Sequence, residues 1–170
     1  MSLIRLHRLI VGLVFTPVLF ACSQPSDTAA TGDTGVAAGA TANYNLTMDM
    51  AEFMAHVVEP VADSLWQSAG WVLDQHDGYY ELYPTNDEEW LQAHNRSALI
   101  VELGNAMLLP GRVQEGPWRT YAEAMSTVGI SLMAATDAQN NEDFFQAGAQ
   151  LYSVCTACHQ AYNPEILSRF

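Results

Sequence analysis

Two cysteines and a histidine stand together in the run Cys155-Thr156-Ala157-Cys158-His159. On a helix, residues three and four apart lie on one face, so both thiols and the imidazole would point to the same side. Two thiols at this spacing can form thioethers with the vinyl groups of a haem, and the neighbouring imidazole can bind its iron. The pattern predicts one covalent haem c, with Cys155 and Cys158 as attachment sites and His159 as an iron ligand.

Other uses of a close cysteine pair fit this chain less well. A zinc site would need a second pair of ligands, and the third cysteine, Cys22, lies far away in the sequence. A thioredoxin-like redox pair would need a βαβ context, which the apolar pattern does not show. A disulfide between Cys155 and Cys158 would constrain almost nothing, because it would join neighbouring turns.

The beginning of the chain predicts export. Residues 1–21 combine basic residues with an apolar run from Leu9 to Phe20, which is shorter than the roughly 20 residues of a membrane-spanning helix. The run Leu19-Phe20-Ala21-Cys22 resembles the lipobox of bacterial lipoproteins. This resemblance implies cleavage before Cys22, lipidation of its thiol and, because serine follows, a periplasmic protein tethered to the outer membrane. An ordinary cleaved signal is the alternative.

The charge of the chain restricts its partners. It has 6 Lys and Arg against 19 Asp and Glu, a net charge of -13, and no lysine, which excludes nucleic acid as a partner. Cleavage before Cys22 would remove two arginines and no acid, so the charge would become -15. Such a protein favours a redox partner with a basic docking surface. Residues 22–45 are small and polar and predict a flexible tether, so the lipid would be the only contact with the membrane.

Residues 46–170 predict four helices. Apolar residues recur at helical spacing from Leu46 to Val72, with a kink at Pro60, and again after Thr85 and Glu88, which have the spacing of a capping box. Further helices begin near Pro117 and at Asn140 or Asn141, and the last one ends before Pro164. The expected inner face of the second helix comprises Trp90, Leu91, His94, Ala98, Val101, Gly104 and Leu108. No alternating run predicts a strand. The fold class expected is all-α, an antiparallel four-helix bundle.

A CxxCH motif in the last helix of such a bundle, followed by Tyr162, resembles the class II cytochromes c, the cytochrome c prime family and its low-spin relatives. Only the segment LYSVCTACHQAY carries the likeness. It implies a monohaem electron carrier and not an enzyme, with a homodimer left open. The alternative is a five-coordinate protein that binds nitric oxide or carbon monoxide. Asn163 stands where the family usually has Arg or Lys, which argues against that alternative.

The resemblance also implies that a residue of the first helix covers the distal side of the haem. Met50 and Met54 lie on the apolar stripe of that helix, whereas His56 lies among its polar residues. Met54 is our expected sixth ligand, because it lies nearer the kink. An open iron site and a histidine ligand are the alternatives.

Four further side chains have weaker assignments. Arg112 and Arg119 are candidate partners of the haem propionates, with a solvated surface role as the alternative. His94 is expected to be a hydrogen-bonded core or haem-edge residue, and His76 a solvated one. We find no Ser/His/Asp or paired-carboxylate arrangement that indicates an enzyme.

Overall fold

The computed structural model describes residues 43–169, which are mostly helical and include a small two-stranded sheet. The predicted signal segment, Cys22 and most of the predicted tether lie outside the described residues. None of the helices described is both long and apolar enough to cross a membrane.

The first helical stretch has three parts: α1 (Met50–Phe53), the π-helical segment η1 (Met54–Val58) and α2 (Glu59–Trp66). Asp49 caps it, because its side chain accepts a hydrogen bond from the backbone of Glu52 at 2.9 Å. The backbone N–H of Glu59 donates to the carbonyl of Met54, five residues back. Pro60 follows directly and has no N–H to donate. The irregularity expected at Pro60 therefore takes the form of a π turn just before it.

The prediction that this helix continues to Val72 without any strand is wrong. The helix ends at Trp66, and β1 (Trp71–Asp74) pairs with β2 (Gly78–Glu81) as an antiparallel hairpin. Gly70 adopts a φ of 96°, which turns the chain out of the helix. The side chain of Asp74 then accepts hydrogen bonds from the backbones of His76 and Asp77 at 2.6 and 2.7 Å, which closes the turn. Aromatic residues in both strands and the β-branched Val72 in β1 favour this pairing.

The remaining helices are α3 (Asp87–Met107), α4 (Trp118–Asp137) and α5 (Asn141–Tyr162), followed by the short 3-10 segment η2 (Pro164–Arg169). Pro117 and Asn140 stand at the starts of α4 and α5, as expected. The start of α3 differs by one residue, since Asn86 is the cap and accepts from the backbone of Glu89 at 3.0 Å. Thr85 instead donates to the Glu89 carboxylate through its backbone and its hydroxyl.

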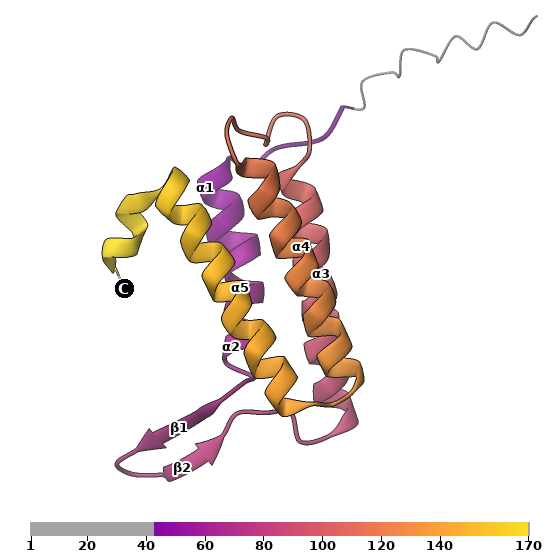
Figure 1. Ribbon diagram of the computed structural model, residues 1–170, viewed down its shortest axis with the longest axis vertical. Coiled ribbons are helices and arrows are strands. Elements are labelled where there is room, and N and C mark those ends of the chain that lie inside the picture. Colours follow the sequence, from indigo (N-terminus) through magenta and orange to yellow (C-terminus); the bar gives the residue numbers. More distant parts are fainter. Residues whose placement is uncertain (1–42, 170) are drawn as a thin grey trace, which may run out of the picture. The chain divides into compact units, whose positions relative to one another are not determined.

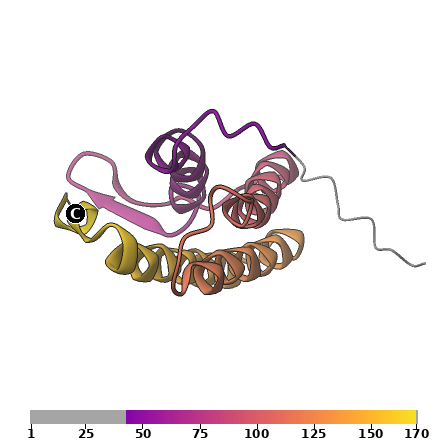
Figure 2. The ribbon, with the colours of Figure 1, turned by 90° about the horizontal axis from the view of Figure 1, so that it is seen from above.

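Successive helical stretches run in opposite directions and lie side by side, which gives the described residues two ends (Figures 1 and 2). The hairpin end holds the end of α2, the hairpin, the start of α3, the end of α4 and the start of α5. The motif end holds α1, the end of α3, the start of α4 and the end of α5. Pairs in close contact are α3 with α4, α4 with α5, and α2 with α3 and α5.

Small residues set the close approach of α3 and α4. A Cβ on Gly104 would lie 2.7 Å from the carbonyl oxygen of Ala122, and one on Gly129 would lie 2.9 Å from the backbone nitrogen of Val101. The hydroxyl of Ser126 donates to the carbonyl of Val101 at 3.0 Å. The helices meet through backbone as well as side chains.

The expected inner face of α3 is only partly correct. The residues buried are Trp90, Ala93, Ser97, Ile100, Leu103, Gly104 and Met107. Leu91, expected inside, is 59% exposed. Apolar residues occur all round this helix, so their spacing does not indicate which face is buried. The small residues that allow close packing select the buried face.

Candidate haem site

Helix α5 carries all three residues of the CxxCH motif near its C-terminal end. Its helical backbone places Cys155, Cys158 and His159 on neighbouring turns of one face. Cys158 is buried, with 8% of its surface exposed, while Cys155 and His159 are partly exposed. Both cysteines are free thiols. The arrangement presents two thiols and an imidazole from a single rigid element.

The surroundings of the motif favour uncharged side chains. Burial, together with the neighbouring Cys158 thiol, raises the pKa of Cys155 to about 11, and burial also raises the pKa of Cys158. Burial lowers the pKa of His159 below its ordinary value of 6.5, while the nearby Glu59 carboxylate acts in the opposite direction. The imidazole is therefore neutral at pH 7 and keeps the lone pair that a metal ion binds.

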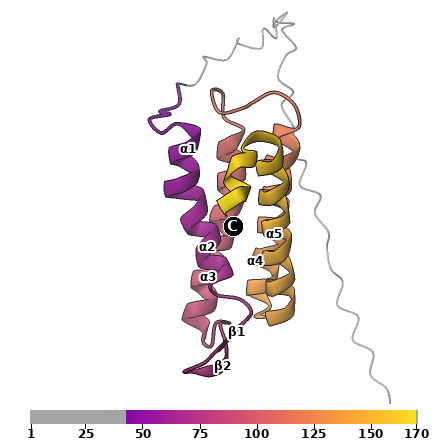
Figure 3. The ribbon, with the colours of Figure 1, turned by 90° about the vertical axis from the view of Figure 1, so that its left-hand side faces the viewer.

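The residue that follows the π turn, Glu59, lies near enough to His159 for its charge to act on the imidazole. Glu59, whose charge acts on His159, donates its backbone N–H to the carbonyl of Met54. Met54 is partly buried and packs against the core, as do Met50, Val57 and Cys155. Figures 2 and 3 show the ribbon of α1 standing away from that of α5 at the motif end. Partly buried apolar side chains of α1, η1 and α5 thus pack against one core.

His56 is exposed, as predicted, and so points away from the core. Met50 and Met54 both lie near the motif end and both are partly buried, so burial does not distinguish which of them is the ligand. Met54 differs in beginning the π turn. Turns of this kind are rare and occur often at functional sites. The assignment of Met54 therefore remains a prediction.

Arg112 supplies a test of whether the residues fit a haem carboxylate. Its guanidinium carbon lies 4.0 Å from the centre of the Phe53 ring, directly beside Met54 in the sequence. Its Nε is the buried side-chain polar atom that has no hydrogen-bond partner among the described residues. A buried donor without an acceptor is costly, and a propionate is an anion that could accept from it. The residues present therefore fit the group.

Arg119 lies in a different environment. Its guanidinium pairs with Glu123 at 3.3 Å, four residues along α4, and the two side chains are 64% and 58% exposed. The geometry matches an exposed surface pair and gives no support to a role beside a propionate.

Tyr162 fixes the end of α5 against the start of α4. Its ring makes edge contacts with Trp118 and Tyr121 at centroid distances of 5.0 and 6.3 Å, and its hydroxyl donates to the carbonyl of Glu115 at 2.7 Å. The backbone of Asn163 donates to the carbonyl of His159 at 2.8 Å and ends the helix. These contacts hold the turn that carries His159.

Towards the middle of α5, Trp66 of α2 fixes the two helices to each other. Its Nε1 donates to the carbonyl of Gly148 at 3.0 Å, and its ring makes an edge contact with Tyr152 at 5.8 Å.

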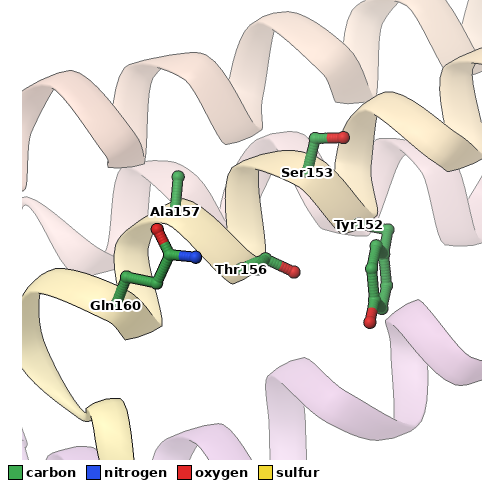
Figure 4. A pocket seen from close by; sticks show the side chains of 5 residues that line it. All are labelled: Tyr152, Ser153, Thr156, Ala157 and Gln160. Carbon is green, nitrogen blue, oxygen red and sulfur yellow. The ribbon is translucent and has the colours of Figure 1, made fainter. Parts of the chain in front are cut away.

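Figure 4 shows Tyr152 at one end of a hollow of about 260 Å³ on α5, which Ser153, Thr156, Ala157 and Gln160 also line. Thr156 and Ala157 are the residues between the two cysteines, so this open hollow adjoins the motif.

The remaining histidines lie away from the motif. His94 Nδ1 contacts the Asp137 carboxylate at 3.0 Å and the Thr136 hydroxyl at 3.3 Å, near the hairpin end. The prediction of a hydrogen-bonded histidine is correct, but its position is not at the motif end. His76 is exposed in the hairpin turn, as predicted. In the described part of the chain, no three His, Cys, Asp or Glu side chains converge as a zinc site would require.

Two residues of the site were absent from the sequence-based set. The charge of Glu59 acts on His159 because α2 packs against α5. The ring of Phe53 contacts the Arg112 guanidinium because the loop after α3 returns to α1. Both relations join distant parts of the chain, so local spacing carries no signal for them.

No family model, no curated protein and no solved structure matches this chain.

Proposed function

We propose that the chain binds one haem c and transfers single electrons. The observation that carries this proposal is the placement of Cys155, Cys158 and His159 on one face at the end of α5. The two thiols would hold the group covalently and the imidazole of His159 would bind its iron. When bound, the iron supplies the one-electron chemistry, and the protein supplies ligands and a dry surrounding.

The other residues of the site have supporting roles in this proposal. Met54 would provide a thioether on the opposite side, a ligand pair typical of electron-carrying cytochromes. Arg112 would donate to a propionate through the Nε that has no other partner. Apolar side chains of α1, η1 and α5 would exclude water. The class II cytochrome c family describes this arrangement best, with the haem held in an antiparallel four-helix bundle.

The proposed location of the protein is the periplasm. Cleavage before Cys22 and lipidation of its thiol would tether the domain to the outer membrane. The acidic surface would then meet a redox partner that carries basic residues, in an encounter that weakens as salt is added.

Optical spectra of the protein, produced with a haem c attachment system, test the proposed function. We expect a low-spin spectrum that becomes high-spin and sensitive to carbon monoxide in Met54→Ala, because the open position then admits a gas. Met50→Ala is the matched control, since Met50 is one turn away and similarly placed. It should leave the spectrum low-spin.

Each other outcome corrects a different part of the proposal. A wild-type spectrum that is already high-spin and unchanged by Met54→Ala would favour the gas-binding alternative. A low-spin spectrum that both methionine variants retain would assign the sixth position to a histidine. A protein without covalent haem would overturn the proposal as a whole.

A further inference from the structure

The hairpin projects from the end of the helices opposite the CxxCH motif (Figure 1). Its base packs on α5 through Trp71, and a hydrogen bond between the residues that flank the two strands closes it. The ring of Trp71 lies 5.6 Å from that of Phe145 on α5, and the backbone of Leu82 donates to the carbonyl of Gly70 at 3.0 Å. Most of the other hairpin residues are exposed, whereas Val72 and Gly78 are partly buried.

The register of the strands sorts their side chains onto two faces. Trp71 lies opposite Glu81, and Leu73 lies opposite Tyr79, so these four residues share one face, which we call the hairpin face. The exposed fractions of Trp71, Leu73 and Tyr79 are 57%, 79% and 60%. An isolated two-stranded hairpin is marginally stable in water, and its apolar face is normally covered. Here an apolar cross-strand pair faces solvent.

The charges around this face have one sign. The exposed acids at the hairpin end are Asp74, Asp77, Glu81, Asp87, Glu88, Glu89, Asp137, Glu142 and Asp143. Between Trp71 and Glu89 there is no Lys or Arg. In the described part of the chain, the arginines are Arg96, Arg112, Arg119 and Arg169, none of which lies in the hairpin or in the helix turns that adjoin it.

We propose that the hairpin face is a docking surface for a protein that presents an apolar pocket bordered by Lys or Arg side chains. The apolar pair Leu73 and Tyr79 would enter the pocket, and the surrounding carboxylates would pair with its border. An anionic bilayer would be repelled by these carboxylates, and a second copy of the chain would bring the same charges to the contact. The inference stands on the hairpin alone, so it can fail or succeed independently of haem attachment.

Synthetic peptides can serve as probes of this surface. The first peptide contains Lys and Leu, the second Lys and Ser, and the third Glu and Leu, so charge and apolar character are varied separately. Fluorescence anisotropy of labelled peptides measures binding to the mature protein. We expect the Lys/Leu peptide to bind best, and the double variant Leu73→Ser/Tyr79→Ser to weaken its binding about tenfold.

The matched control is Leu91→Ser/Ile130→Ser. These two side chains are 59% and 60% exposed, but they lie on α3 and α4. The control variant should bind the Lys/Leu peptide as the wild type does. Circular dichroism checks that every variant is folded, and Leu73→Ser alone gives a milder change at the same face.

Three results would overturn the proposal. The first is equal binding of the Lys/Leu peptide to wild type, Leu73→Ser and the double variant, which would reduce the contact to general electrostatic attraction. The second is binding of neutral phosphatidylcholine vesicles that is lost in the double variant, which would make the hairpin face a lipid contact. The third is concentration-dependent dimerisation in sedimentation experiments that the same variant abolishes, which would assign the face to a second copy.

Discussion

At the scale of single residues, the candidate site comprises the CxxCH motif and an arginine that has an unsatisfied donor. The guanidinium of Arg112 stacks on Phe53, yet its buried Nε has no acceptor among the described residues. A buried donor in this state costs free energy in the haem-free protein and becomes useful once a carboxylate lies beside it. Arg112 should therefore be unfavourable in the haem-free protein and favourable in the haem-loaded protein.

The substitution Arg112→Met tests this difference. In the haem-free chain, the free energy of unfolding should stay the same or rise by about 1 kcal/mol, because an unsatisfied donor is removed while an apolar side chain still covers Phe53. In the haem-loaded chain, the midpoint potential should become more negative, because a positive charge that favours the reduced state is lost. Chemical denaturation and a redox titration measure the two effects.

The control for this prediction is Arg119→Met. Arg119 forms an exposed pair with Glu123, so its loss should change stability by less than about 0.5 kcal/mol and leave the potential unaltered. If Arg112→Met destabilised both forms equally and left the potential unchanged, Arg112 would be a structural residue and not a partner of a propionate.

At the scale of elements, local signals predicted much of the fold. Helix starts at Pro117 and Asn140 and the helix end before Pro164 follow from cap chemistry that involves only neighbouring residues. The hairpin could not be found in the same way, because Val72 continues the apolar spacing of the helix before it. Gly70 and the turn at Asp74 decided the outcome. The inner face of α3 depends on packing against α4, which spacing alone does not reveal.

The site was predictable to a similar extent. Cys155, Cys158 and His159 are neighbours in the sequence, so their common face follows from helix geometry. Glu59 and Phe53 enter the site only through contacts between distant segments. Pro60 indicated an irregular helix, but it did not indicate the form of that irregularity, a π turn that begins at Met54.

The contact of α3 with α4 gives a test of stability at this scale. Gly104→Ala should lower the free energy of unfolding by about 1–3 kcal/mol, because the new Cβ would lie 2.7 Å from the carbonyl oxygen of Ala122. Gly148→Ala is the matched control in α5, where the nearest atom, on the ring of Trp66, would be 3.7 Å away. It should be neutral or stabilise by up to about 1 kcal/mol, since alanine favours helix. Equal effects in urea denaturation would contradict the proposed close packing.

The hairpin turn gives a test of pH dependence. Hydrogen bonds from the backbones of Asp77 and His76 lower the pKa of Asp74 from its ordinary value of 3.8. A carboxylate with a lowered pKa stabilises the turn above the unfolded pKa, and this contribution is lost as the pH falls through the folded pKa. NMR titration should therefore give a midpoint below 3.8 for Asp74. The amide signals of His76 and Asp77, which donate to this carboxylate, should shift with the same midpoint. Asp74→Asn should abolish that step, and a midpoint at or above 3.8 would contradict the turn geometry.

At the scale of the whole molecule, the described part separates two kinds of surface. The motif end carries the cysteine pair, His159 and Arg112, whereas the hairpin end carries exposed aromatics and carboxylates without an arginine. This separation would let one end hold a partner while the other holds the redox group. The net charge of -13 should make every encounter with a basic partner sensitive to salt.

The intact mass of the protein tests the central claim most directly. From cells that attach haem to a control cytochrome, we predict a chain that begins at Cys22 and carries one haem. Cys155→Ala/Cys158→Ala should lose the haem, and Cys22→Ala should keep it while losing any lipid. A wild-type chain whose mass lacks the increment of one haem, in cells that load the control cytochrome, would contradict covalent haem attachment.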